Sequence, residues 1–357
     1  MTKQTKKTPA IILGATGAVG QRLLQLLDGH PWFDVVGVAA SEKSAGKPYS
    51  DACRWILPGD PPERSAKQIV TPLDPDAIRC GRPAFAFSAL PATVAREIEP
   101  RFAEAGYAVC SNASAFRDEP DVPLVVPEVN ADHLGLLDTQ RTTRGWDGLI
   151  VTNPNCSTTG IALALKGLDL AFGLRRVSVT TLQAISGAGY PGVPSLEILG
   201  NVIPWIPGEE KKIERETRCL LGTIVDGKRI EANLTVSAQA TRVPVIDGHT
   251  FCLSLGFDDP PTPAAAKEAL SGFRGPEHVQ LLPSAPERPV RVVDGSDRPQ
   301  PRLDGLTGDG MTVVVGRVRR CAIQDLRLVG LVHNTLRGAA GGAILNAELL
   351  VAEGRIA

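Results

Sequence analysis

The sequence predicts a two-domain α/β protein, with a doubly wound parallel sheet first and an α+β domain with a mostly antiparallel sheet second. At 357 residues the chain exceeds one ordinary core and has room for about two domains. Short apolar strands alternate with helices up to about residue 130, which is typical of a parallel sheet covered on both faces. After Gly160 the strands become longer and alternate apolar with polar residues, which favours an antiparallel sheet with helices on one face.

The composition favours small-molecule partners. A net charge of −1 offers no basic field for nucleic acid or an anionic membrane, and no apolar run reaches the roughly 18 residues of a membrane span. The seven cysteines are odd in number, scattered and without CxxC spacing, so the sequence predicts neither a disulfide framework nor a metal site. We therefore expect a protein of the reducing cytoplasm that binds neither nucleic acid nor membranes.

The first strand, Pro9 to Leu13, runs directly into the turn Gly14-Ala-Thr-Gly-Ala-Val-Gly20, and an amphipathic helix continues through Leu27. Such a turn lets the backbone approach a pyrophosphate, which then lies at the helix N-terminus. The pattern GxxGxxG differs by one position from GxGxxG, but its place between strand and helix predicts a Rossmann-like dinucleotide-binding domain. The alternative is an ordinary strand–helix turn.

The second strand, Val35 to Ala40, is followed by residues that bear on the choice of cofactor. Ser41, Lys43 and Ser44 suit a 2′-phosphate and so favour NADP. Glu42 leaves NAD as the alternative, because an acidic side chain after this strand binds the ribose 2′-hydroxyl.

Two further strands, Ala84 to Phe87 and Ala108 to Ser111, continue the alternation, with a helix from about Thr93 to Ala105 between them. Doubly wound sheets bind their ligands outside the carboxyl ends of the strands. Ser88 and Arg117 follow these two strands and are therefore candidate ligand contacts.

A candidate nucleophile stands at the next strand end. Val151 and Thr152 lead into an Asn-Pro-Asn turn, and Cys156 follows where an apolar helix begins. The free N–H groups and positive dipole of a helix N-terminus bias a thiol there toward the nucleophilic thiolate. The alternative is a buried cysteine that acts as a small apolar residue.

The second domain carries five expected strands, at Val177 to Leu182, Asn233 to Ala238, His249 to Leu255, Met311 to Val318 and Leu326 to Val332. Pro- and Gly-rich segments at 189–208 and 258–310 are predicted to be long connections, candidates for lids or subunit contacts. Within the second of these, the Pro- and Arg-rich stretch 282–306 receives no assignment. The last helix is expected at about Gly338 to Ala352.

A nucleophilic cysteine needs a base, and the sequence offers five histidines. His249 and His333 are the better candidates, because His30 and His278 are predicted to lie at the surface and His133 in a loop. Arg242, near His249, offers a bidentate fork for a carboxylate; its alternative is a surface ion pair.

Eight motifs together resemble the aspartate-β-semialdehyde dehydrogenase family, and in particular its archaeal and fungal type. They are Gly14-Ala-Thr-Gly-Ala-Val-Gly20, Ser88-Ala-Leu-Pro, Ser111-Asn-Ala-Ser-Ala-Phe-Arg117, Asn153-Pro-Asn-Cys156-Ser, Gln183-Ala-Ile-Ser-Gly-Ala-Gly, Glu209-Glu-Lys-Lys212, Arg242-Val-Pro-Val-Ile-Asp-Gly-His249 and His333-Asn-Thr-Leu-Arg-Gly-Ala-Ala-Gly-Gly342. The resemblance runs from Ile11 to Leu350 with the motifs in the family's order.

The resemblance implies a role for each candidate residue. Cys156 would be the nucleophile, His249 the general acid/base, and Gln183 and Asn155 would place the reacting group. Arg242 would bind the substrate's α-carboxylate and Glu209 its amino group, while Arg117 and Lys212 would hold the phosphate. The cofactor would contact Gly14, Thr16, Gly17, Ala18, Val19, Ser41, Lys43, Ser44, Ser88, Ser186, Gly187 and Asn334.

The implied reaction is NADPH-dependent reduction of L-4-aspartyl phosphate to aspartate semialdehyde through a thioester on Cys156. N–H groups just after Cys156 are expected to stabilise the oxyanion. Two alternatives remain: a malonyl-CoA or related acyl reductase of the same fold, and a dinucleotide-binding sensor in which Cys156 is a redox switch.

The resemblance also implies an organisation into domains. Residues 1–152 would form the dinucleotide-binding domain, completed by the C-terminal helix within 334–357, and residues 153–333 the catalytic and dimerisation domain. A homodimer or homotetramer would result, with the sheet of the second domain at the interface.

Overall fold

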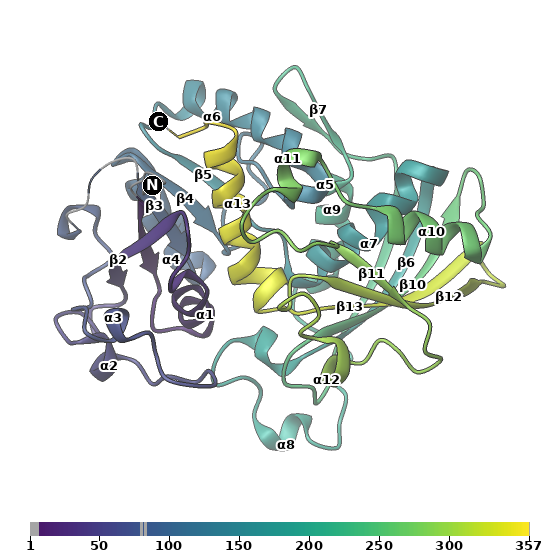
Figure 1. Ribbon diagram of the computed structural model, residues 1–357, viewed down its shortest axis with the longest axis horizontal. Coiled ribbons are helices and arrows are strands. Elements are labelled where there is room, and N and C mark those ends of the chain that lie inside the picture. The colour runs from purple at the N-terminus through teal and green to yellow at the C-terminus, as the bar shows by residue number, and fades with distance from the viewer. Residues whose placement is uncertain (1–6, 79–80, 82–83, 357) are drawn as a thin grey trace, which may run out of the picture.

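The computed structural model describes residues 7–78, 81 and 84–356, and these form two large sheets, the first with helices on both faces and the second with helices on one face (Figure 1). Residues 1–6 and Cys80 lie outside the described residues. In the described part of the chain, no helix is long and apolar enough to cross a membrane.

The first sheet is fully parallel, with the strand order β2-β1-β3-β4-β5. Its strands are β1 (Thr8–Leu13), β2 (Phe33–Ala39), β3 (Ala84–Ser88), β4 (Tyr107–Ser111) and β5 (Leu149–Thr152). The helices around it are α1 (Ala18–Leu27), α4 (Ala92–Glu104), α6 (Leu136–Arg144) and α13 (Gly341–Ala352). The doubly wound parallel sheet predicted from the sequence is confirmed.

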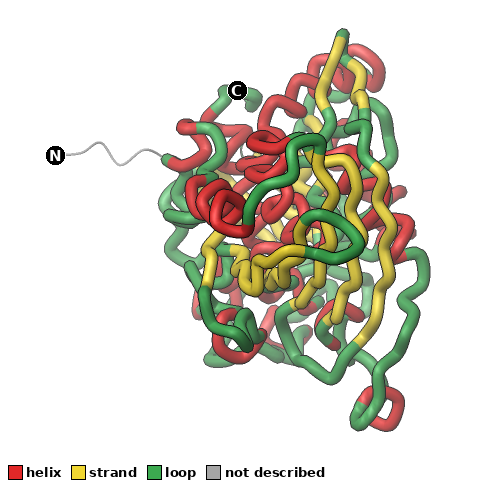
Figure 2. Tube along the Cα trace, turned by 90° about the vertical axis from the view of Figure 1, so that its right-hand side faces the viewer, coloured by secondary structure: helices red, strands yellow, loops and turns green. Residues whose placement is uncertain are grey.

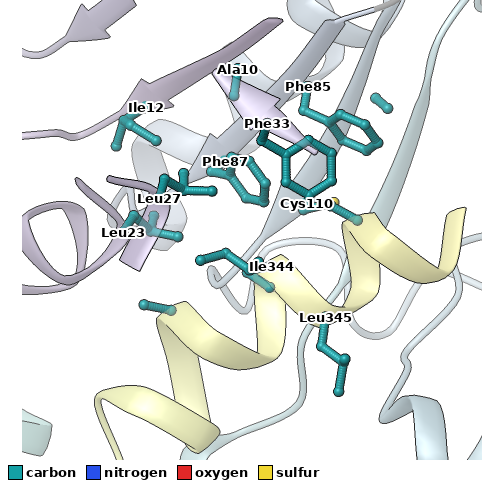
Figure 3. Packing of buried hydrophobic residues seen from close by; sticks show 14 of the residues in the cluster. Ala10, Ile12, Leu23, Leu27, Phe33, Phe85, Phe87, Cys110, Ile344 and Leu345 are labelled. Atoms are coloured by element: carbon teal, nitrogen blue, oxygen red, sulfur yellow. The ribbon is translucent and has the colours of Figure 1, made fainter. Parts of the chain in front are cut away.

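Alternation along β1 supplies two separate cores, one on each face of the first sheet. Ala10 and Ile12 pack in one cluster with residues of α1 and α13, whereas Ile11 and Leu13 pack on the other face with residues of α4. Figure 3 shows Ile344 of α13 directed toward the phenylalanines of the sheet. The end of the chain therefore returns to the first sheet.

The second sheet is mixed and mostly antiparallel, with the order β11-β12-β13-β10-β6-β9. Its strands are β6 (Leu174–Gln183), β9 (Thr235–Arg242), β10 (His249–Phe257), β11 (Val290–Val293), β12 (Val313–Arg320) and β13 (Leu326–Val332). Only the two edge strands pair in parallel, β9 with β6 and β11 with β12. In Figure 2 this strand-rich part of the molecule is turned toward the viewer.

One face of the second sheet is covered by α7 (Cys156–Phe172), α9 (Glu209–Leu220) and α10 (Pro263–Gly272), which share a core with its strands. The opposite face is open, with exposed residues on β6 and β10 that include Thr180 and Cys252. The smaller helices are α2 (Tyr49–Ala52), α3 (Glu63–Ala66), α5 (Pro127–Asn130), α8 (Ser195–Ile198), α11 (Glu277–Gln280) and α12 (Pro301–Asp304). The 3-10 turns are η1 (Pro75–Ala77), η2 (Ala131–Gly135) and η3 (Ile185–Ala188), and a hairpin is formed by β7 (Thr223–Val225) and β8 (Lys228–Ile230).

Several expected boundaries differ from the structure. The segment 258–310 is not a plain connection, because it holds α10, α11, β11 and α12, and its unassigned Pro- and Arg-rich stretch contributes β11 beside β12. These four residues were not recognised as a strand because prolines and charged residues surround them. The last helix begins as a π-helical turn, η4 (Leu336–Ala340), before α13.

Candidate active site

Cys156 is the first residue of α7, as the sequence predicted, and Asn155 caps this helix. The Asn155 Oδ1 accepts from the N–H groups of Ser157 and Thr158 at 3.0 and 3.2 Å. Thr159 N–H bonds to the Asn155 carbonyl. These amides were expected to stabilise an oxyanion, but they already donate hydrogen bonds to Asn155. Of these amides, only the Ser157 N–H also interacts with the Cys156 sulfur.

His249, the first residue of β10, contacts the thiol, with 3.2 Å between Nε2 and the Cys156 Sγ. On the other side of the ring, the Ala184 N–H donates to Nδ1 at 3.0 Å. Because that bond occupies the Nδ1 lone pair, the neutral ring carries its proton on Nε2 and donates it toward the sulfur. With this tautomer Nε2 has no free lone pair for the thiol proton, which a general base at His249 would need.

Burial determines the protonation of this pair. It raises the pKa of the Cys156 thiol to about 12, with the Glu209 carboxylate adding to the rise, while Arg117, the Ser157 N–H and Arg242 oppose it. Burial also lowers the pKa of His249 to about 3, assisted by the positive charge of Arg242. Both groups are therefore neutral at pH 7, and the expected bias toward thiolate is wrong because desolvation outweighs the helix N-terminus.

Two glycines leave room for the pair. A Cβ on Gly187 would lie 2.8 Å from an Arg242 nitrogen and 2.9 Å from the His249 Cε1, and one on Gly338 would lie 2.8 Å from the Cys156 Cβ. Neither glycine has the positive φ that would require it for backbone reasons. Both are needed for close approach, and Gly338 belongs to η4, the π-helical turn that presses against the start of α7.

Arg242 ends β9 beside this pair and is buried. One of its terminal nitrogens donates to the Ala184 carbonyl at 2.8 Å. Among the described residues no carboxylate forms an ion pair with it, so the predicted alternative of a surface ion pair does not apply. A buried guanidinium without an acidic partner is suited to bind a carboxylate from a ligand.

Glu209, the first residue of α9, joins the other polar side chains of the site. Its Oε1 accepts from Asn155 at 2.7 Å and from Gln183 at 3.0 Å, and its Oε2 lies 3.7 Å from the Lys212 Nζ. Glu209, Asn155 and Gln183 are buried, whereas Lys212 is partly exposed. The structure thus brings these four predicted residues to the Cys156 turn.

Arg117 is linked to the same turn by Glu216, a residue that the sequence analysis did not single out. It forms an ion pair with Glu216 of α9 at 3.1 Å, and Glu216 also accepts from the Asn155 N–H at 2.5 Å. Sequence reasoning missed Glu216 because no quoted motif includes it. The available signal was its spacing of seven from Glu209, which places both carboxylates on one face of α9.

The glycine-rich turn follows β1 and ends at α1, as predicted. Gly14 has φ +81°, and a Cβ there would lie 2.9 Å from the Ala89 carbonyl oxygen; one on Gly20 would lie 2.3 Å from the Gly14 carbonyl oxygen. Gly17 is the N-cap of α1 and meets only a single atom, at 3.5 Å. The N–H groups of Ala18 and Val19 begin this helix, which lacks a side-chain cap. The turn has an open, electropositive end of the kind that binds phosphate.

The turn is supported from below. Tyr49 donates its hydroxyl to the Ala15 carbonyl at 2.9 Å, and Gln21 donates to the Thr16 carbonyl at 3.1 Å. After β2, Ser41 and Lys43 line a cavity of about 640 Å³ together with Glu42 and Arg101. Ser44 lies in the same turn but does not line that cavity.

The remaining predicted cofactor contacts lie around the ends of β3, β6 and β13. Asn334 donates to the Ser186 Oγ at 2.8 Å and accepts from the Gly248 N–H at 2.9 Å, one residue before His249. Ser88 is buried at the end of β3, where its carbonyl accepts from Asn112. Ser186, Gly187 and Asn334 are therefore grouped next to His249.

The four histidines other than His249 lie outside the contact with the thiol. His30 is not at the surface but buried, because it pairs with the buried Glu348 of α13 at 2.8 Å. His133 is also buried, in η2. His278 is half-exposed, as predicted, and His333 is buried, with 3.5 Å between its Nδ1 and the Thr335 Oγ1.

Family models match most of the chain. The model described as semialdehyde dehydrogenase, NAD binding domain, matches residues 9–137, and that described as semialdehyde dehydrogenase, dimerisation domain, matches residues 165–337. The chain belongs to the semialdehyde dehydrogenase family. The resemblance inferred from the motifs is confirmed, and with it the two-part α/β fold of this family member.

Curated relatives of this family member span nearly its whole length. An aspartate-semialdehyde dehydrogenase of Methanothermobacter thermautotrophicus is 52% identical over 95% of this chain and 97% of the relative. That of Archaeoglobus fulgidus is 50% identical over 96% and 97%, and that of Schizosaccharomyces pombe 47% over 96% and 98%. Both archaeal and fungal relatives are thus similar, in agreement with the predicted type.

Solved structures of the family share the fold. An aspartate semialdehyde dehydrogenase of Candida albicans, solved with NADP, has a TM-score of 0.88 at 42% identity and covers 98% of this chain and 99% of its own. One from Vibrio cholerae, complexed with ASA, has a TM-score of 0.76 at 27% identity over 97% and 99%.

Proposed function

We propose that this protein is an NADP-dependent aspartate-semialdehyde dehydrogenase that reduces L-4-aspartyl phosphate to L-aspartate 4-semialdehyde and releases phosphate. The observation that carries the proposal is the contact of 3.2 Å between the Cys156 thiol and His249, with Arg242 and Glu209 beside it. The curated relatives bear this enzyme's name. We assign the reaction to the biosynthesis of lysine, threonine and methionine.

The residues present fit the cofactor. Gly14 and Gly20 allow a tight turn at the uncapped start of α1, and we assign the pyrophosphate to Gly14, Thr16, Gly17, Ala18 and Val19. Ser41, Lys43 and Ser44 would hold the 2′-phosphate, and Ser88, Ser186, Gly187 and Asn334 would meet the nicotinamide. Bound NADPH supplies the hydride. Glu42 beside Lys43 keeps NAD as a secondary cofactor.

The substrate's α-carboxylate and ammonium explain the two buried charges of the site. Arg242 has no acidic partner among the described residues, and a substrate carboxylate would satisfy its guanidinium. The Glu209 carboxylate raises the pKa of the Cys156 thiol, and it would accept the ammonium group. Gln183 and Asn155 hold Glu209 in place through its Oε1. This pairing fits an α-amino acid.

In the first step the sulfur attacks the acyl phosphate, the C–O bond to phosphate breaks and a thioester forms. His249 holds a proton on Nε2 against the sulfur and stabilises negative charge there as the thiol ionises. The thiol proton leaves with the departing phosphate, which balances the charge of that group. Lys212 and Arg117 would bind the phosphate as it leaves.

In the second step the thioester carbon accepts a hydride, which a free carboxylate would not accept. The resulting tetrahedral alkoxide collapses, the C–S bond breaks, and the aldehyde is released. The departing thiolate is again stabilised by the His249 Nε2–H and regains its proton from solvent. In this mechanism His249 donates a hydrogen bond to the sulfur and transfers no proton itself, which is less than the general acid/base role that the resemblance implied.

The alternative of a malonyl-CoA reductase is not favoured. Malonyl-CoA has no ammonium group, so the buried Glu209 would remain without a positive partner from that substrate. We also propose a homodimer or homotetramer built on the open face of the second sheet. A reducing cytoplasmic setting is proposed as well, because it suits the free thiols of this chain. We also propose the division into domains that the family resemblance implies, with boundaries at 152 and 333 and with the C-terminal helix returning to the first domain.

A coupled assay tests the proposal. L-aspartate semialdehyde, phosphate and NADP should give NADPH, and omission of phosphate should abolish steady-state formation. NAD in place of NADP should give a lower kcat/KM. Oxidation of NADPH by malonyl-CoA at a greater rate than the aspartyl reaction would contradict the proposed substrate.

A further inference from the structure

Glu216 on α9 makes two contacts that the proposed roles do not use. It is fully buried, and its two carboxylate oxygens face different partners. Oε2 accepts from the Asn155 backbone N–H at 2.5 Å, and Oε1 accepts from an Arg117 terminal nitrogen at 3.1 Å. Asn155 immediately precedes Cys156, so one side chain links the nucleophile turn with a phosphate-binding arginine.

The helix α9 holds Asn155 from two sides. Glu209 accepts from the Asn155 side chain at 2.7 Å, and Glu216, two helical turns later, accepts from its backbone. The helix lies beside α7, the helix that Cys156 begins. The turn that orients the sulfur is therefore fixed by α9 and not only by its own cap.

Arg117 is held by the same carboxylate. Its second terminal nitrogen donates to the Asn112 carbonyl at 2.8 Å. Its Nε is buried and has no hydrogen-bond partner among the described residues. A guanidinium fixed at two corners with a third donor free is preorganised for an anion.

We propose that Glu216 is a positioning residue, which orients Cys156 through the Asn155 amide and sets phosphate affinity by fixing Arg117. A carboxylate is required because both neighbours are donors, so both of its oxygens must accept. A glutamine offers one acceptor and one donor and cannot satisfy both. This inference rests on the proposed phosphate-releasing reaction for its kinetic part only.

The test compares E216Q with E214Q in the full-length protein. Glu214 is a matched control on the same helix, because it accepts a backbone N–H of β9, that of Ala238, at 3.0 Å and does not contact the Cys156 turn. In the direction that consumes phosphate, we expect E216Q to lower kcat and to raise the KM for phosphate, each by about tenfold to a hundredfold. The KM for NADP should stay within about twofold of wild type, and E214Q should match wild type throughout.

A double-variant comparison shows whether Glu216 acts through Arg117. Once R117A has raised the KM for phosphate, adding E216Q should raise it no further. Independent effects that multiply would contradict the proposed route, as would a phosphate KM in folded E216Q equal to that of E214Q. A generally destabilised protein would lose active fraction without this selective change in KM.

Hydrogen exchange tests the Asn155 contact without any assay of turnover. Exchange in a peptide that covers Asn155 should be about tenfold faster in E216Q than in E214Q. Unchanged exchange would overturn the positioning role even if the enzyme were active. Conversely, faster exchange in E216Q, together with a wild-type protein that has no aspartate-semialdehyde activity, would support the Glu216–Asn155 contact and contradict the proposed function. If E216Q does not fold, E216D replaces it, since this shorter side chain cannot span both partners, and the same shifts are expected.

Discussion

At the scale of single residues, burial and two opposite charges control the nucleophile. Glu209 raises and Arg242 lowers the pKa of the Cys156 thiol, and both lie in the buried site. The sequence indicated each of these residues through its motif. It did not indicate the protonation of Cys156, because the desolvation that dominates its pKa depends on packing around the finished site.

Removing each of these two charges in turn should shift the pKa of the Cys156 thiol in opposite directions. Glu209→Gln removes a negative charge that favours the protonated thiol, so the pKa should fall and alkylation by iodoacetamide at pH 8 should become faster. Arg242→Leu removes a positive charge and should make it slower. A shift of one pKa unit changes the thiolate fraction about tenfold. Glu210→Gln is the control, because the Glu210 carboxylate accepts from the Ala240 N–H and is not among the main groups that shift the pKa of the thiol. A change in the same direction for both variants would contradict the electrostatic explanation.

Gly187 should tolerate no side chain. In Gly187→Ala the added Cβ would meet Arg242 and His249 at 2.8 and 2.9 Å, so both would be displaced. A misplacement of about 1 Å costs about a hundredfold in rate, and we expect kcat/KM to fall by that factor. The melting temperature should change little. Gly272→Ala, where no atom lies within 4 Å, should leave the rate unchanged. Equal activity of the two variants would show that the close approach is unimportant.

At the scale of elements, the site is built where helices and strands end. Cys156 begins α7, Arg242 ends β9, His249 begins β10 and Glu209 begins α9. Local patterns predicted the first sheet well, because its strands are continuous apolar runs bounded by turn residues. They did not predict β11, whose four residues lie in a Pro- and Arg-rich stretch, nor the π-helical turn before α13.

Two glycine variants in the cofactor turn should affect different properties, one the stability of the fold and the other the binding of NADP. Gly20→Ala places a Cβ 2.3 Å from the Gly14 carbonyl oxygen, and overpacking of this kind costs about 1–3 kcal/mol in the free energy of unfolding. Gly17→Ala meets a single atom at 3.5 Å, so stability should be kept while NADP binds more weakly at the start of α1. Urea unfolding and NADP titration measure the two effects. Equal losses of stability in both variants would contradict this separation.

At the scale of the whole molecule, the site depends on contacts between residues far apart in the chain. The thiol and His249 are separated by 93 positions, and Arg117 and Glu216 by 99. The family resemblance supplied the first pair. Glu216 could not be found in this way, because its role follows from how α9 packs beside α7.

The open face of the second sheet should hold the proposed subunit contact. Cys252 lies exposed on β10 next to Thr180 of β6, opposite the helix-covered face. Cys252→Arg adds a bulky charge there and should shift the protein to monomers in sedimentation velocity, while Leu170→Arg, an exposed change on α7, should not. Retention of the wild-type oligomer by the Cys252 variant would place the interface elsewhere.

The most direct test of the central claim is detection of the thioester on Cys156. The protein should be mixed with L-aspartate semialdehyde and NADP without phosphate, quenched in acid and digested for mass spectrometry. We predict one aspartyl group on the peptide that contains Cys156, which disappears when phosphate is added before the quench, and no adduct in Cys156→Ala. An unmodified Cys156 in a protein that still reduces NADP, or an adduct on another cysteine, would contradict the account.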